Sequence, residues 1–260
     1  MKKSPFAAGV LGALTLLLAC STPAQDDRAT MTDVFLVLPK SGMTAAFEQA
    51  LREHIAYRQD AGETRAWETY TVALGDNPSI YQFRSGGMDW ADFDAGVAED
   101  GEKGLGSNWA ANVDQYVEHL HHYIEVSDFD NSDWPEDLGQ KPYYGVTTWS
   151  VNGNAEAAAD AAREEFSRVA MAGNWSATAG NWMWLSRVGG SSKMMLVTAY
   201  DSFANMAPPE ESFYEFLASQ VGEDQAASLF ADFGAGYTSS NYTIWAYRPD
   251  LSGAGSGGND

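Results

Sequence analysis

The sequence is poor in cysteine and in positive charge. Its 260 residues contain one cysteine, and 15 Lys and Arg stand against 36 Asp and Glu, which gives a net charge of -21. A single cysteine excludes an intrachain disulfide framework and any zinc or iron–sulfur site built from several cysteines. Nucleic-acid phosphates would repel so acidic a chain, and no basic cluster extends beyond Lys2-Lys3. Nucleic acid is therefore not expected as a partner.

Motifs of nucleophilic and nucleotide-binding enzymes are also missing. The sequence has neither the G-x-S-x-G nor the S-x-x-K arrangement that places a reactive serine. The glycine-rich stretch over 101–106 lacks the G-K-[ST] of a phosphate loop. Hydrolases and nucleotide-using enzymes of these kinds are therefore not expected.

The amino terminus has the pattern of an export signal. Two lysines precede a mostly apolar run from Phe6 to Ala19, which is shorter than the roughly 20 residues that a spanning helix needs. The run Leu17-Leu18-Ala19-Cys20 resembles the lipobox of bacterial lipoproteins, in which the signal is cut before a lipid-modified cysteine. The alternative is a stray thiol in an ordinary cleaved signal. The resemblance implies a signal peptide over 1–19, lipid on Cys20 and a polar tether over 20–31.

Lipid on Cys20 would make the membrane a partner of the mature chain, because several acyl chains together hold firmly. In bacterial lipoproteins generally, an Asp directly after the cysteine tends to retain the protein at the inner membrane. Here that position is Ser21. The resemblance therefore implies an outer-membrane lipoprotein, and we expect its domain to face the periplasm.

Two segments of similar size, 32–126 and 143–249, repeat one order of elements. In the first, apolar periodicity predicts a helix over 44–59, a short helical piece over 90–93, a glycine-rich loop over 101–106, a helix over 108–120, and strands over 33–39, 66–74, 80–84 and 122–126. In the second, it predicts helices over 154–171, 210–218 and 223–231, and strands over 144–150, 182–188, 194–199 and 242–247. Each segment reads β-α-β-β-α-β.

Two polar stretches border the second segment. Residues 127–142 are acidic and contain two prolines, which is typical of a linker. Residues 250–260 are rich in Gly and Ser and are expected to form a disordered tail.

A β-α-β-β-α-β unit puts both helices on one face of a four-stranded sheet and leaves the other face uncovered. The sister repeat can cover it. This layout, with Trp90-Ala91-Asp92-Phe93 and Tyr200-Asp201-Ser202-Phe203 after the third strand of each repeat, resembles the dimeric α+β barrel superfamily. The resemblance implies an α+β fold of two ferredoxin-like repeats whose antiparallel sheets pack face to face, a monomer with an internal pseudo-dimer. Members of that superfamily include cofactor-free monooxygenases and haem-binding or haem-degrading proteins.

The candidate chemical groups are histidines. His54 follows Phe47 and Leu51 at helical spacing, at the edge of the face that packs on the sheet. In the superfamily several members hold a ligand in that helix–sheet crevice, so His54 is either a base or an axial haem ligand, or else a core imidazole. His119 is expected to end a helix, and His121 and His122 to point to opposite faces of a strand, which argues against a metal site.

Aromatic side chains lining a crevice suit a flat apolar ligand. The predicted lining comprises His54, Trp67, Tyr81 and His119. In the second repeat the matching helix has no histidine, so a second equivalent active site is not expected. The acids of the linker lack the spacing of a calcium loop and are predicted to be solvated.

Two functional interpretations follow. The first is a lipid-anchored periplasmic protein whose tandem domain binds a small apolar molecule or a partner protein without catalysing a reaction. The alternative is a cofactor-free monooxygenase or a haem-dependent enzyme that works in the crevice, with His54 as the catalytic residue and haem as the cofactor in the second case.

Substitution Cys20→Ser tests the predicted anchor. Removing the only thiol removes the site of lipid attachment, so the protein should move from the membrane fraction to the soluble fraction after cell lysis. Immunoblotting of the two fractions measures this. Unchanged fractionation would refute lipidation of Cys20.

Overall fold

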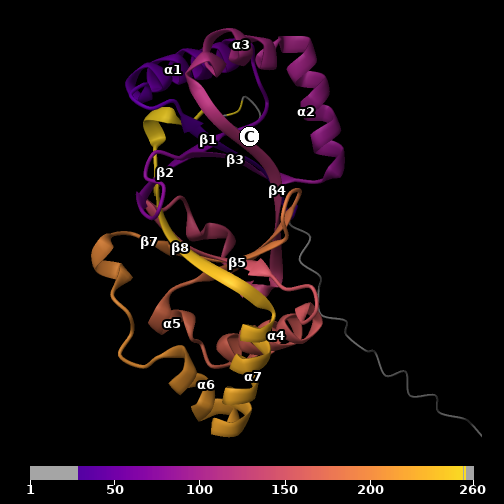
Figure 1. Ribbon diagram of the computed structural model, residues 1–260, viewed down its shortest axis with the longest axis vertical. Coiled ribbons are helices and arrows are strands. Elements are labelled where there is room, and N and C mark those ends of the chain that lie inside the picture. Colours follow the sequence, from indigo (N-terminus) through magenta and orange to yellow (C-terminus); the bar gives the residue numbers. More distant parts are fainter. Residues whose placement is uncertain (1–28, 254, 256–260) are drawn as a thin grey trace, which may run out of the picture.

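The first repeat forms a four-stranded antiparallel sheet with its helices on one face (Figure 1). The computed structural model describes residues 29–253 and 255. Its elements in this half are β1 (Met31–Pro39), α1 (Thr44–Asp60), β2 (Glu68–Leu74), β3 (Tyr81–Met88), α2 (Trp90–Lys103), α3 (Leu105–Asn112) and β4 (Val117–Asp133). The strands lie in the spatial order β4-β1-β3-β2.

The second repeat has the same arrangement, with strand order β8-β5-β7-β6. Its elements are β5 (Tyr143–Val151), α4 (Glu156–Ala172), α5 (Ser176–Ala179), β6 (Trp182–Val188), β7 (Lys193–Tyr200), α6 (Phe213–Val221), α7 (Glu223–Ala235) and β8 (Tyr237–Tyr247). The helices of the two repeats lie at opposite ends of the long axis, with the strands between them (Figure 1). The predicted order of elements and the dimeric α+β barrel fold are confirmed.

The two sheets are joined at both edges, so they form one closed barrel as well as facing each other. β2 pairs with β8, where Tyr70 lies opposite Tyr247, and β4 pairs with β6, where Ser127 lies opposite Leu185. Closure satisfies the backbone groups that an open sheet would leave at its edges.

β4 is long enough to pair with two strands in turn, β1 through its first part and β6 through its second. The linker predicted over 127–142 is therefore wrong for 127–133, which continue the strand. The acids of this stretch were expected to be solvated, but Asp128 is paired. It forms an ion pair with Arg163 of α4 and accepts hydrogen bonds from Asn131. The connection between the repeats is therefore the shorter stretch 134–142, between the end of β4 and the start of β5.

The helix predicted over 108–120 is also wrong in its second half. α3 ends at Asn112, a short 3-10 turn follows, and Val117 begins β4, because β1 needs an antiparallel partner over its whole length. The glycine-rich loop is helical instead. Asp89 caps α2 in a capping box with Asp92, α2 runs on to Lys103, and Gly104 at φ 64° makes the turn into α3.

The barrel interior joins the repeats through aromatic and charged side chains. Tyr70 of β2 meets Tyr144 of β5 edge to face, with 5.6 Å between ring centroids. Arg187 of β6 lies over the ring of Tyr123 of β4 at 3.7 Å. Side chains of the two repeats contact each other here, so each repeat supplies part of the other's core.

The end of the second repeat packs into the first. Leu251 is 1% exposed and belongs to the core beneath α1, and Gly253 exchanges backbone hydrogen bonds with Trp67. The disordered tail predicted over 250–260 is thus wrong for 250–253. Similarly, Met31 at the end of the predicted tether already pairs in β1. Residues 1–28, with Cys20 and the predicted signal peptide, lie outside the described residues.

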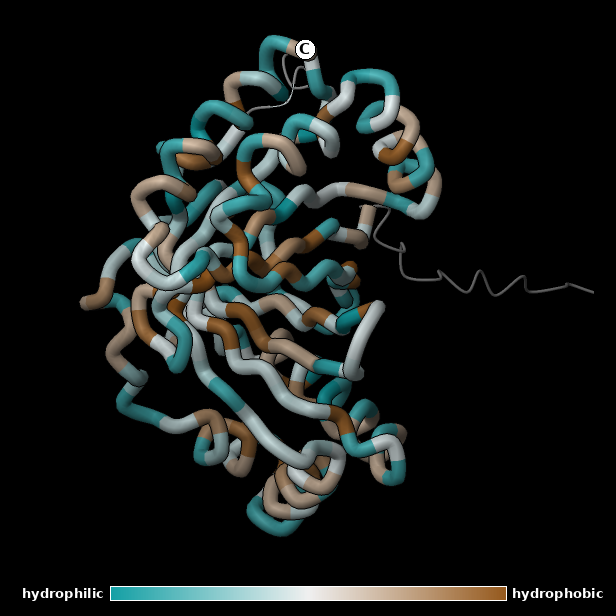
Figure 2. The backbone as a smooth tube through the Cα atoms, turned by 45° about the horizontal axis from the view of Figure 1, so that its top comes forward, coloured by the Kyte–Doolittle hydropathy of each residue, from teal (hydrophilic) through white to brown (hydrophobic). Residues whose placement is uncertain are grey.

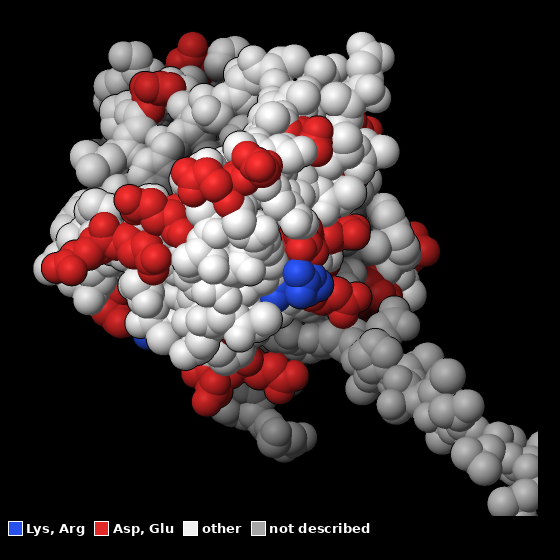
Figure 3. Space-filling model, turned by 90° about the horizontal axis from the view of Figure 1, so that it is seen from below, with Lys and Arg blue, Asp and Glu red and all other residues white. Residues whose placement is uncertain are grey.

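Apolar and acidic residues are distributed differently over the molecule. Apolar stretches run along the strands in the middle of the molecule (Figure 2), and carboxylates outnumber cations on the end that carries the second repeat's helices (Figure 3). Within 29–253, no helix has both the length and the apolar character needed to cross a membrane.

Substitution Leu251→Ala tests whether the turn over Pro249–Leu251 is part of the first repeat's core. Deleting a fully buried leucine side chain leaves a cavity, which costs about 2–5 kcal/mol of unfolding free energy. Urea unfolding followed by tryptophan fluorescence measures the loss. Leu74→Ala is the matched control, because Leu74 is 57% exposed and should change stability by less than about 0.5 kcal/mol. Equal effects of the two substitutions would contradict the assignment.

Candidate active site in the first repeat

A cavity of about 350 Å³ lies between the helices of the first repeat and the outer face of its sheet. α1, α2 and α3 supply one wall, the four strands of the sheet supply the other, and the turn over Pro249–Leu251 closes part of it. Its surface is mostly apolar, with Phe35, Leu51, Phe83, Leu105, Trp109 and Leu251 among the lining residues. The volume and lining suit one small, flat, apolar molecule.

α1 brings His54 into this cavity. Phe47, Ala50, Leu51 and His54 are the buried residues of the helix, and their spacing puts them on the face that packs against the sheet. His54 is 2% exposed.

Both ring nitrogens of His54 are engaged. Nδ1 lies 2.7 Å from Asn108 Oδ1, and Nε2 lies 3.4 Å from Nη1 of Arg58, one turn further along α1. Burial lowers the pKa of His54, and the neighbouring guanidinium lowers it further. The imidazole is therefore neutral near pH 7, with the hydrogen on Nδ1 donated to Asn108.

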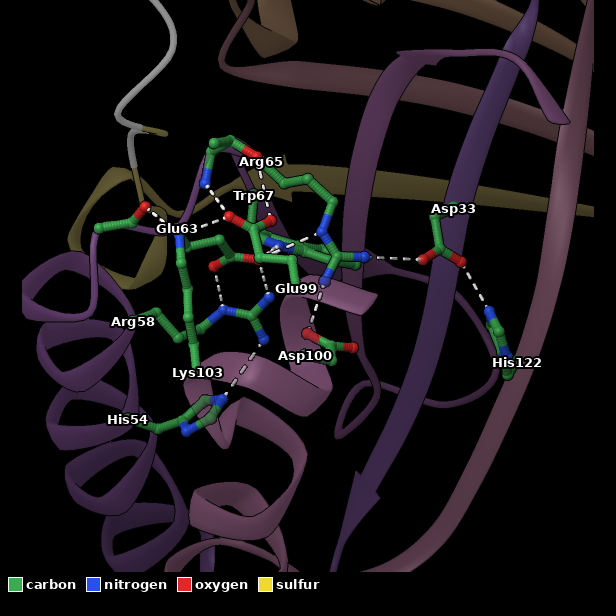
Figure 4. Close-up of polar contacts among 12 residues, drawn as sticks. Asp33, His54, Arg58, Glu63, Arg65, Trp67, Glu99, Asp100, Lys103 and His122 are labelled. Carbon is green, nitrogen blue, oxygen red and sulfur yellow. Dashed lines mark hydrogen bonds and ion pairs between the residues drawn. The ribbon is translucent and has the colours of Figure 1, made fainter. Parts of the chain in front are cut away.

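A chain of polar contacts runs from His54 across one end of the cavity to His122 (Figure 4). Arg58 pairs with Glu63, Glu63 with Arg65 at 3.3 Å, and Arg65 with Asp33 at 3.8 Å. The indole of Trp67 lies between the two guanidiniums, at 5.0 and 5.2 Å, and its N–H donates to Glu63. Each of these charged groups thus has a group of opposite charge as its neighbour.

His122 reaches the cavity from β4. It lies directly across from Phe35 of β1, and the two rings stack at 4.1 Å with an interplanar angle of 5°. Its Nε2 lies 2.6 Å from Oδ1 of the buried Asp33. Half of the His122 side chain is exposed, at 50%, so it stands at the open edge of the cavity.

α2 is tied to the loop after α1 by ionic contacts. Asp100 accepts from Arg65 at 2.7 Å, and Glu99 binds both Lys103 and Thr64. Burial raises the pKa of Asp100 and outweighs the neighbouring guanidiniums. These contacts hold the apolar Phe93 and Val97 of α2 at the cavity wall.

The structure brings two of the four predicted lining residues together. His54 and Trp67 both line the cavity. Tyr81 instead lies in the core beside Phe47 and donates to Glu48 at 2.8 Å, and burial raises its pKa. His119 does not end a helix but lies in β4, opposite Leu38, with most of its side chain exposed. It is outside the cavity because the strand turns it to the other face.

Sequence reasoning missed the other polar groups of the cavity, among them Asp33, Arg58, Arg65 and His122. One signal was available: Asp33 opens an otherwise apolar strand and shares the face of Phe35 and Val37. The prediction that His121 and His122 point to opposite faces agrees with their places on β4, but only the pairing of β4 with β1 puts His122 next to Asp33.

The second repeat has a cavity in the matching place, of about 290 Å³. Most of its lining residues are aromatic, including Trp149, Trp175, Trp182, Trp184, Phe166 and Phe233. None of its lining residues carries a titratable side chain. This cavity can bind an apolar molecule but can move no proton, so the two repeats are not chemically equivalent.

Haem iron needs an axial His, Cys, Met or Tyr, and the second cavity is lined by none of these. In the first cavity both nitrogens of His54 are engaged and Nε2 of His122 faces Asp33, which leaves Nδ1 of His122 as the imidazole nitrogen with a lone pair to offer iron. Among the described residues no three His, Cys, Asp or Glu side chains gather as metal ligands.

Comparison with known proteins identifies the fold. No protein-family profile and no curated protein matches the sequence. A candidate monooxygenase from Fusobacterium nucleatum superimposes with a TM-score of 0.53 at 8% identity, over 85% of this chain and 94% of that one. A chlorite dismutase variant from Candidatus Nitrospira defluvii matches with a TM-score of 0.50 at 9% identity, over 85% and 92%. An anthrone oxidase-like protein matches with a TM-score of 0.47 at 12% identity, over 85% and 92%. The shared fold is the dimeric α+β barrel.

The lowered pKa of His54 predicts a pH dependence of stability. In the unfolded chain an imidazole binds a proton near its ordinary pKa of about 6.5, whereas the buried ring resists protonation, so acid favours unfolding. Between about pH 7.5 and about pH 5 the unfolding free energy of the unmodified protein should fall by more than that of His54→Gln. Of the charged groups around His54, Arg58 opposes its protonation and Glu63 favours it.

Urea unfolding at both pH values measures this difference. His121→Gln is the control, because His121 is exposed and its loss should leave the pH dependence unchanged. Identical pH dependence in the unmodified protein and in His54→Gln would show that His54 is not held neutral by burial.

Proposed function

We propose that the chain is a cofactor-independent oxygenase of a small, flat, apolar molecule, which it binds in the first-repeat cavity. The observation that carries the proposal is an apolar cavity with two imidazoles and a chain of paired ionic groups at one end. Apolar walls bind such a molecule by removing it from water, and an imidazole can take a proton from it. Among the solved structures of this fold is a candidate monooxygenase, and the proposal extends that reaction class to this chain.

The reaction needs a substrate that becomes electron-rich when it loses a proton. A C–H hydrogen leaves as a proton, and the electron pair stays on carbon. Dioxygen takes up these electrons and forms a C–O bond, giving a peroxide. The peroxide takes back the first proton from the base, its O–O bond then breaks as the second hydrogen leaves the same carbon as a proton, and the released hydroxide combines with that proton and departs as water. A methylene group and dioxygen thus become a ketone and water. The protein's part is to bind, to take the proton and to keep competing water away.

Binding without reaction, the other interpretation of the sequence, would need the same cavity. The titratable groups of the first cavity favour an enzyme over a binding protein. A site that only binds can be lined by aromatic side chains, as the second cavity is. Such a site does not require buried ionic groups, which are costly to desolvate.

We also propose that this domain is attached to the outer membrane by lipid on Cys20 and faces the periplasm. The support is the run Leu17-Leu18-Ala19-Cys20 followed by Ser21. Its test is the fractionation of Cys20→Ser described above.

Substitution Gly106→Phe should block the cavity. Gly106 lies in α3 on the cavity wall, and a Cβ placed there meets no atom within 4 Å, so the ring can turn into the apolar space. Affinity for an uncharged fluorescent probe such as 1-aminoanthracene should fall about tenfold or more, which corresponds to ~1.4 kcal/mol. Dioxygen uptake with the tricyclic ketone anthrone should fall with it. A fluorescence titration and an oxygen electrode measure the two effects.

Gly101→Phe is the matched control. Gly101 is also a helical glycine with nothing within 4 Å of a Cβ, but it lies outside the cavity lining. It should keep probe affinity and oxygen uptake. If Gly106→Phe binds the probe as the unmodified protein does, the first-repeat cavity is not the binding site. Binding of anthrone without any oxygen uptake would leave a binding protein and refute the oxygenase.

A further inference from the structure

His122 and Asp33 form a pair in which a carboxylate orients an imidazole. The carboxylate of Asp33 accepts the hydrogen on Nε2 across 2.6 Å, so the lone pair of the neutral ring lies on Nδ1. Stacking on Phe35 at 4.1 Å fixes the plane of the ring. Neighbouring strands hold all three residues, because His122 of β4 is paired with Phe35 of β1 and Asp33 lies two residues before Phe35. A base with a fixed tautomer and a fixed plane results.

His54 is the poorer proton acceptor of the two imidazoles. A proton on its Nε2 would stand 3.4 Å from the guanidinium of Arg58, in a position that is 2% exposed. A proton on His122 would face a carboxylate, and half of the side chain lies in contact with solvent. Positive charge is therefore better accommodated on His122.

The charges at the polar end also restrict the substrate. Three carboxylates, Asp33, Glu63 and Asp100, stand against two guanidiniums, Arg58 and Arg65. One negative charge is in excess when both imidazoles are neutral. It would repel an anionic substrate, and it would stabilise the imidazolium that forms when a neutral substrate gives up a proton.

On the basis of the proposed function, we propose that His122 is its catalytic base, that Asp33 positions that base, and that the substrate is a neutral, flat, apolar molecule with one weakly acidic methylene group. The substrate C–H bond breaks, and its proton forms a new bond to Nδ1 of His122. The electron pair stays on the substrate, where the rings delocalise it. Asp33 remains ionised and faces the imidazolium.

Deuterium exchange without dioxygen tests this step apart from oxygenation. Anthrone is the probe, since its ketone acidifies a methylene group between two apolar rings. Incubated with the protein in D₂O under argon, it should lose its methylene proton signal in the NMR spectrum faster than in buffer. His122→Gln and Asp33→Asn should each slow the catalysed exchange about 10²-fold. Their affinity for anthrone should stay within about threefold of the unmodified protein, because both act on the proton and little on binding.

His121→Gln is the control from the same strand. His121 is exposed and absent from the cavity lining, so exchange should continue at the unmodified rate. His122 is half-exposed, so His122→Gln should fold, and circular dichroism checks both variants. If Asp33→Asn unfolds, His122→Gln alone decides the question.

Three results would overturn the proposal. They are no catalysed exchange in the unmodified protein, undiminished exchange in His122→Gln, and loss of exchange in His54→Gln while His122→Gln retains it. The outcome is separable from that of the proposed function. Catalysed exchange that depends on His122, without oxygen uptake in air, supports the base and refutes the oxygenase. Oxygen uptake that survives in His122→Gln supports the oxygenase and refutes the base.

Discussion

Closure of the barrel is the constraint on which the molecule depends. A ferredoxin-like sheet alone would leave two strand edges unpaired and one apolar face in water, both of which are costly. Pairing of β2 with β8 and of β4 with β6 removes all four edges at once. The helix-covered outer faces carry the two apolar cavities, and a further cavity of about 460 Å³ lies between the inner faces of the sheets, lined by residues such as Tyr70, Arg84 and Leu185.

The repeats use those outer faces differently. Both repeats keep an apolar cavity there, but the cavity of the second is lined mostly by aromatic rings, whereas that of the first has a chain of ionic contacts at one end. The first cavity is completed by the second repeat, because Leu251 follows β8 and packs beneath α1. A duplicated unit thus yields one site with titratable groups, and the two halves must be folded together to form it.

Burial assigns different properties to two imidazoles of the same cavity. His54 is enclosed and faces a guanidinium, so it is held neutral. His122 stands at the edge and faces a carboxylate. Pairs of titratable groups in contrasting surroundings are typical of sites that move protons. In the ionic chain between them each charged group contacts a group of opposite charge, so no isolated charge faces the apolar part of the cavity.

Periodicity in the sequence determined the order of elements, the duplication and the face of α1 that carries His54, because those depend on local spacing of apolar side chains. It misjudged 127–133, 117–120 and 250–253, where polar residues become strand or core only through a distant partner. Tertiary structure alone decided that His122 meets Asp33 and that Tyr81 and His119 lie outside the cavity. Strand register sets which side chains share a face, and register arises from pairing between segments that are far apart in the chain.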